Sequence, residues 1–177
     1  MTEEFRLDFV MSEIILADDQ LKAIGCIALE STALESCLEK IINNICSFDE
    51  KRSGIFIGQL MIGAKSRIMR DLLWPQVVGT KHEPEFQLIY GEIRDLISKR
   101  NVAVHGEWNS TAAGFMELAT RHNIPSAKKR GGTLSLKATE IMELAHRFDR
   151  CQNHLLRWYA EFLAFSQPSL ENLHDNT

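Results

Sequence analysis

Residues 83–106 read EPEFQLIYGEIRDLISKRNVAVHG, and apolar side chains recur in this run every three or four positions. The recurring residues are spaced like one face of an amphipathic helix: Ile89, Ile93, Leu96 and Ile97. Pro84 stands between two acids, where it suits the first helical turn and the acids complement the helix dipole. Gly106 suits the stop. We therefore predict one long helix that ends at Gly106.

Helical patterns also lie before and after this segment. Apolar residues at spacings of three and four run through residues 21–45, 57–72 and 141–162. Pro75 is expected to end the second of these helices. The sequence leaves open whether a separate helix precedes residue 18 or whether the first patterns form one long bent helix. The fold expected from these patterns is all-α, an antiparallel up-and-down bundle of four to five long helices.

The residues between the motif segment and the last helix have a different pattern. Turn-forming residues separate two short segments, 115–120 and 133–137, that are suited to strands. A small β-hairpin or loop insert before the last helix is therefore expected. The whole bundle is expected to form a single domain over residues 1–165, followed by a frayed tail at 166–177.

Composition limits the class of protein. The 177 residues are 45% hydrophobic and 25% charged, which suits one globular domain with a sizeable core. The amino-terminal residues do not resemble a secretory signal, and no run of about 18 apolar residues is present to cross a bilayer. The sequence therefore predicts a cytoplasmic protein without a membrane partner.

Neither a metal nor a cofactor is expected. The four cysteines lack C-x-x-C spacing, so buried thiols are favoured over a zinc site or a disulfide framework: Cys26, Cys37, Cys46 and Cys151. The histidines outside the motif show no ligand spacing, and the chain has no glycine-rich phosphate loop and no G-x-S-x-G. The usual nucleotide-binding and hydrolase sequence motifs are absent.

Three functional groups stand near the end of the predicted helix. Asn101 and His105 are four residues apart and share a helical face. Arg100 lies about 140° around the axis from His105, but its long side chain can bend back toward that face. One groove could receive all three side chains. The alternative is that Arg100 makes a surface ion pair and His105 caps a carbonyl.

The segment ISKRNVAVHGEW, residues 97–108, resembles the signature of the HEPN superfamily, small all-helical domains of which many are ribonucleases. The pattern of that family is an arginine, a polar residue that is often asparagine, three variable residues and a histidine. Arg100, Asn101 and His105 match every position. The motif covers about a dozen residues, and the helix order extends the resemblance over most of the chain. It implies a homodimer in which both motifs line one cleft.

The residue types suit cleavage of RNA without a metal. The 2′-hydroxyl of RNA attacks the neighbouring phosphorus once its proton is accepted, and a histidine can accept and donate protons near neutrality. We expect His105 to act as general base or acid, Arg100 to stabilise the charge on phosphate, and Asn101 to orient the ring or the phosphate. The displacement needs two proton transfers, which favours a symmetric dimer with a second histidine.

Other residues are candidates to support this site. Glu35 contacts the motif or is an exposed acid, and Trp108 stacks a base or anchors the insert; the second reading is favoured for each. Gly106 is expected to allow close approach of a ligand. The formal charge of −4 argues mildly against nucleic acid, so RNA binding is assigned to local basic residues: Lys99, Lys128, Lys129 and Arg130.

The sequence thus predicts a metal-independent endoribonuclease of the toxin or phage-defence type, with RNA as its substrate and an antitoxin protein as a possible partner. The alternative is a noncatalytic HEPN-like module that forms dimeric interactions or binds nucleotides. An accessory nucleotide-binding subunit for a transferase partner also fits a fold of this kind.

Overall fold

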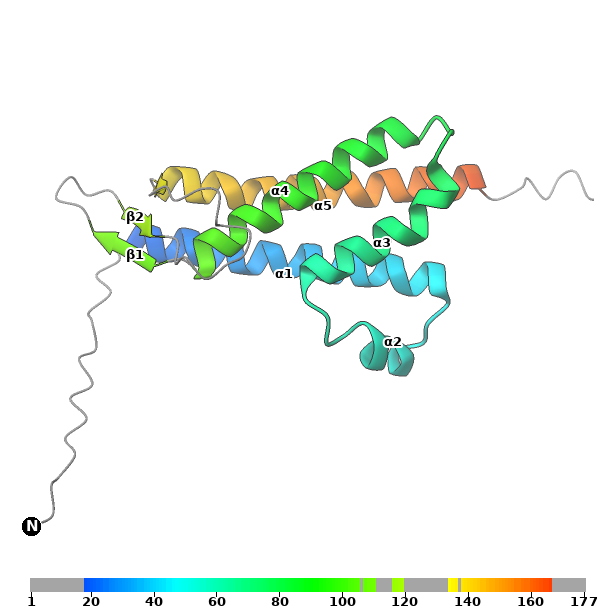
Figure 1. Ribbon diagram of the computed structural model, residues 1–177, viewed down its shortest axis with the longest axis horizontal. Helices are drawn as coiled ribbons and strands as arrows, with labels where there is room; N and C mark the ends of the chain where they lie inside the picture. Colours follow the sequence, from blue (N-terminus) through cyan, green and yellow to red (C-terminus); the bar gives the residue numbers. More distant parts are fainter. Residues whose placement is uncertain (1–17, 106, 111–115, 120–133, 137, 167–177) are drawn as a thin grey trace, which may run out of the picture.

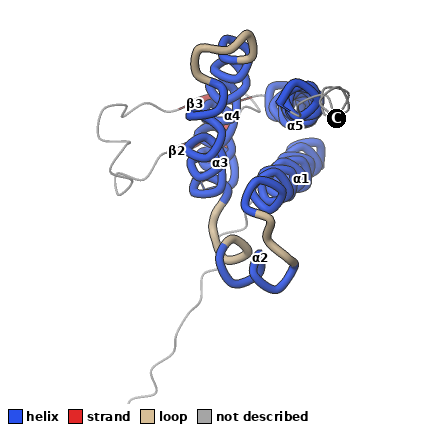
Figure 2. The backbone as a smooth tube through the Cα atoms, turned by 90° about the vertical axis from the view of Figure 1, so that its right-hand side faces the viewer, coloured by secondary structure: helices blue, strands red, loops and turns tan. Residues whose placement is uncertain are grey.

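The computed structural model describes residues 18–105, 107–110, 116–119, 134–136 and 138–166. Its body is all-α, with five helices packed together: α1 (Asp18–Cys46), α2 (Glu50–Phe56), α3 (Ile62–Val77), α4 (Glu83–His105) and α5 (Ala138–Ser166). Four of the helices are long, whereas α2 has 7 residues. Figure 2 shows α3 and α4 together on one side of the bundle and α2 set apart from the other helices.

Three short strands lie between α4 and α5 in the chain. They are β1 (Glu107–Ser110), β2 (Met116–Ala119) and β3 (Leu134–Leu136). The strands pair antiparallel in the order β1-β2-β3, with Trp108 opposite Leu118 and Met116 opposite Leu136. This is where the sequence predicts an insert. Its remaining residues, 111–115, 120–133 and 137, lie outside the described part of the chain.

The apolar face predicted for the motif helix is confirmed. Ile89, Ile93 and Leu96 are each at most 1% exposed, and they join one core that includes Leu34 of α1 and Phe148 of α5. Burial of these side chains is the main force that holds the helix in place, since removing apolar area from water dominates folding. The helix ends at His105, one residue before the predicted glycine stop.

The neighbours of α4 run antiparallel to it. Gly63, near the start of α3, lies against Ile97, and Arg70 further along α3 lies against Tyr90. On α5, Arg147 contacts Glu92, while a residue two turns later contacts the first turn of α4. The three helices α1, α3 and α5 therefore share one direction, and α4 runs opposite to them (Figure 1).

The expectation of an up-and-down antiparallel bundle is therefore wrong for α1 and α3. The chain leaves α1 at Cys46 and passes through α2, and Lys65 in the first turn of α3 contacts both Glu35 and Glu39 of α1. The connection thus returns along α1 before α3 begins. A connection of this length is enough to cover the about 10 Å that separates Glu39 from the end of α1.

Two local expectations are also corrected. Residues predicted as loop form α2, because the side chain of Asp49 accepts a hydrogen bond from the backbone N–H of Arg52 and caps the helix. Pro75 does not end α3, which continues to Val77. Proline in a last turn removes one backbone donor, and the N–H of Val78 still reaches the carbonyl of Trp74 at 3.0 Å.

The cysteines divide into two pairs by burial. Cys37 and Cys151 are buried, whereas Cys26 and Cys46 are half-buried, and all four are free thiols. Burial raises the pKa of Cys37 to about 11 and that of Cys151 to about 12. The buried thiols are therefore protonated near neutrality, and thiolate is the reactive form.

A thiol-specific chromogenic reagent at pH 8 is accordingly expected to modify Cys26 and Cys46 in the native protein and to reach Cys37 and Cys151 only after unfolding. The measurement is the number of fast-reacting thiols before and after addition of denaturant. A variant with both Cys26→Ser and Cys46→Ser is the control and should show no fast phase. Rapid native modification in that variant would contradict the buried placement of the other two.

Candidate functional site

The motif residues occupy the last turns of α4. Ala103 has no exposed surface and faces the core, which fixes the rotation of this part of the helix. With that rotation, Asn101 is exposed and Arg100 is half-buried. Nη1 of Arg100 donates a hydrogen bond to Oδ1 of Asn101 at 3.3 Å. His105 is the last residue of the helix, one turn beyond Asn101. The helix thus brings the three positions together at its carboxyl end.

Asn101 and His105 continue a longer stripe on α4. Tyr90, Arg94, Asn101 and His105 lie within about 60° of one another around the helix, because their spacings are four, seven and four. The neighbouring helix along this stripe is α3, since a Cβ placed on Gly63 would lie 4.0 Å from Cγ2 of Ile97. The face that carries the motif is therefore the side of α4 next to α3.

Lys99 has a carboxylate partner. Its Nζ lies 2.6 Å from Oδ2 of Asp95, one turn earlier on α4. The hydrogen bond from Lys99 is the main reason that the pKa of Asp95 lies below its ordinary value; a second comes from Arg147. The charge of Lys99 is thus partly neutralised where RNA binding is predicted.

The other supporting candidates lie apart from the described motif residues or outside the description. Glu35 lies on α1, and its Oε1 is 2.9 Å from Nζ of the buried Lys65 of α3. Trp108 falls in β1, which follows α4 directly. Gly106 and the basic run Lys128, Lys129 and Arg130 lie outside the described residues.

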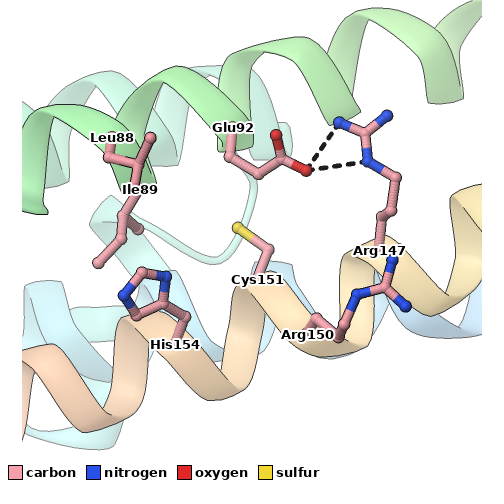
Figure 3. A pocket seen from close by; sticks show the side chains of 7 residues that line it. All are labelled: Leu88, Ile89, Glu92, Arg147, Arg150, Cys151 and His154. Carbon is pink, nitrogen blue, oxygen red and sulfur yellow. Dashed lines mark hydrogen bonds and ion pairs between the residues drawn. The ribbon is translucent and has the colours of Figure 1, made fainter.

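A separate pocket of about 320 Å³ opens between α4 and α5 (Figure 3). Its lining combines apolar, acidic and basic side chains: Leu88, Ile89, Glu92, Arg147, Arg150, Cys151 and His154. Each basic group in it faces a carboxylate: Arg147 meets Glu92 at 2.7 Å and Asp95 at 2.9 Å, His154 meets Glu85 at 2.7 Å, and Arg150 meets Glu143.

This pairing decides what the α4–α5 pocket does. Carboxylates beside every cation would repel a phosphate, so the pocket has little affinity for a polynucleotide. Its ion pairs instead join two helices: Arg147 of α5 bridges Glu92 and Asp95 on α4. The sequence did not single out these residues, although Glu92 and Asp95 sit on one edge of the motif helix.

Comparisons with protein-family models, curated proteins and solved structures found no match for the chain. Within the described residues, no three His, Cys, Asp or Glu side chains gather as metal ligands. None of the described helices combines the length and apolar composition needed to span a bilayer.

Proposed function

We propose that this chain is a metal-independent endoribonuclease of the HEPN type, of the toxin or phage-defence class, that acts on RNA as a homodimer. The proposal is carried by the position of Arg100, Asn101 and His105 in the final turns of a long helix within an all-α bundle. It is supported by the exposure of Asn101 and by the half-buried guanidinium beside it, which contacts its amide oxygen.

The chemistry assigns one role to each side chain. His105 accepts the proton of the 2′-hydroxyl as that oxygen attacks phosphorus, or donates a proton to the leaving 5′-oxygen. Arg100 stabilises the charge that grows on the nonbridging oxygens, since its planar fork matches phosphate geometry. Asn101 orients the ring or the phosphate. The products are a 2′,3′-cyclic phosphate and a 5′-hydroxyl.

A homodimer supplies the second proton transfer. One histidine serves one of the two transfers, and a twofold axis would bring the His105 of a second copy to the opposite side of the phosphate. A dimer would have twice the 20.2 kDa mass of one chain. Light scattering coupled to size exclusion measures this mass directly.

The substrate tests the proposed function. The purified protein is expected to cleave single-stranded RNA in the presence of a chelator, and a 2′-deoxy substitution at the cleaved position is expected to abolish cleavage there. End-group analysis by mass spectrometry should find cyclic phosphate. Equal cleavage of DNA would refute the mechanism, because DNA lacks the attacking hydroxyl.

A noncatalytic interaction module is the second candidate, and one observation favours it. Ile55 and Phe56 of α2 and the nearby Met61 are 64%, 60% and 71% exposed. Exposed apolar side chains close together are typical of protein contact sites. An antitoxin or another protein partner would cover them. Absence of RNA cleavage by the wild-type chain would favour this candidate over the nuclease.

A further inference from the structure

An aromatic cavity of about 130 Å³ lies between α3 and α4. Its lining comes from both helices: Arg70, Trp74, Phe86, Gln87 and Tyr90. Phe86 is only 1% exposed, and its ring centroid lies 6.5 Å from that of Trp74 and 6.4 Å from that of Tyr90. Two half-buried rings therefore stand on a buried aromatic floor, which holds them in fixed positions.

A guanidinium completes the cavity. The Cζ atom of Arg70 lies 5.7 Å from the centroid of the Tyr90 ring, within the range of a cation–π contact. Its Nε is 2.7 Å from Oδ1 of Asp71. Aromatic rings and arginine planes are the surfaces on which proteins stack unpaired bases. The cavity thus combines the two kinds of surface that a nucleobase recognises.

The size of the cavity favours part of a larger ligand. Pockets that enclose complete small molecules measure about 300–1,000 Å³. A cavity of about 130 Å³ is too small for that and suits one flat group. A base that projects from a strand fits this description, because the rest of the strand remains outside on the surface.

Two further arginines extend the cavity toward the motif. Arg94 lies one turn after Tyr90 on α4, and Arg67 lies one turn before Arg70 on α3. Both side chains are exposed, and neither makes an ion pair with a described residue. The distance along α4 from Tyr90 to Asn101 is about 16 Å, which is room for a few nucleotides.

We infer that this face of α3 and α4 is a binding track for single-stranded RNA, in which the cavity stacks an unpaired base and Arg67 and Arg94 hold the backbone that leads to the motif. The inference rests on the proposed function, since it names where that substrate lies away from the cleaved bond. Charge complementarity selects the ligand. The chain carries a net −4, yet this face presents Arg67, Arg70 and Arg94.

Binding can be measured without cleavage. Fluorescence anisotropy of a labelled single-stranded RNA of about 12 nucleotides is recorded with the full chain carrying His105→Ala, and with further variants in that background. Arg67→Gln with Arg94→Gln is expected to weaken binding about tenfold and to reduce the salt slope by about 2, one for each lost phosphate contact. Tyr90→Leu is expected to weaken binding about tenfold through lost stacking.

The control is Arg157→Gln, which removes an exposed arginine from α5 and leaves this face intact. Binding by the Arg67 and Arg94 variant equal to that of Arg157→Gln would overturn the track. So would the absence of RNA binding by the wild-type chain. Should Tyr90→Leu lower the thermal midpoint, the exposed arginine variants still decide the result.

Two arms separate this inference from the proposed function and from a peptide ligand. Cleavage by the wild type, with binding unaffected by the variants, overturns the track alone. Loss of binding in the variants, with no cleavage by the wild type, overturns the nuclease alone. A polyglutamate peptide of equal charge should compete poorly; displacement of RNA at equal concentration would overturn recognition of a base.

Discussion

Cleavage of RNA is expected to fall about 100- to 10,000-fold in the His105→Ala variant, the range that general acid–base groups contribute. The reason is that alanine can neither take the 2′-hydroxyl proton nor return one to the leaving oxygen. The rate constant under saturating RNA measures the loss. The matched control is His146→Ala, which removes a histidine that is 63% exposed on α5 and should leave the rate unchanged.

Arg100 provides the companion measurement. In Arg100→Lys the charge remains but the planar fork is lost, so a rate loss of about 100-fold or more is expected. If both side chains act on one phosphate, the double variant should be little slower than the slower single variant. Losses that multiply fully would indicate two independent sites. Unchanged cleavage in His105→Ala would contradict the assignment of that residue.

Much of the bundle could be predicted from apolar spacing alone. The repeat of Ile89, Ile93 and Leu96 predicts both the helix and the side of it that is buried, because burial follows the helical period. The directions of the helices could not be predicted in this way. They depend on the connection through α2, whose 7 residues are too few to show a period and carry no sign of which way the chain returns.

The candidate site divides along the same line. That Asn101 and His105 share a face follows from their spacing in the chain. The position of Arg70 over Tyr90 does not, since it depends on how far α3 is shifted along α4. Close approach at Gly63 sets that shift, and a single sequence does not show which residue of α4 a glycine will meet. Base-stacking residues were missed for this reason.

Lys65 is the clearest case of a residue whose role depends on the fold. Within the amphipathic pattern of residues 57–72 a lysine is expected at the surface, yet its side chain is 3% exposed. Its Nζ lies 2.9 Å from Oε1 of Glu35 and 2.9 Å from Oε2 of Glu39. The other oxygen of Glu39 accepts a hydrogen bond from Ser53 of α2 at 3.0 Å. One network thus joins α1, α2 and α3.

The Lys65→Ala variant is expected to lose about 3 kcal/mol of the free energy of unfolding. Removing one partner of a buried ion pair costs about 3–5 kcal/mol, and the lower end applies because Glu35 and Glu39 retain about a third of their side-chain exposure. Urea denaturation followed by circular dichroism measures the change. Lys40→Ala, at an exposed position of α1, is the control and should change stability by less than about 0.5 kcal/mol.

The pH dependence follows from the same contacts. The hydrogen bond from Lys65 holds the pKa of Glu39 below its ordinary value of 4.5. A carboxyl group with a lowered pKa stabilises the fold above that ordinary value, and the stabilisation is lost as pH falls through the folded-state pKa. Wild-type stability should therefore fall on acidification below 4.5, and Lys65→Ala should show a smaller fall.

Lys65 also has a limit on the alkaline side. Burial disfavours its charged form, but the hydrogen bonds that it donates to Glu39 and Glu35 outweigh this and hold its pKa above 10.5. Its contribution is therefore complete below that value and is lost only as pH rises through the folded-state pKa. Between these limits the free energy of unfolding contains the full contribution of the network.

A triple variant separates the ion pair from simple loss of packing. Replacing Lys65 with methionine and both Glu35 and Glu39 with glutamine removes all three charges while keeping the side-chain volumes similar. Replacement of a buried ion pair by neutral groups is often close to neutral, so most of the stability lost in Lys65→Ala should return. If the triple variant is as unstable as Lys65→Ala, packing of the lysine stem is the cause. The unpaired carboxylates would then not account for the loss.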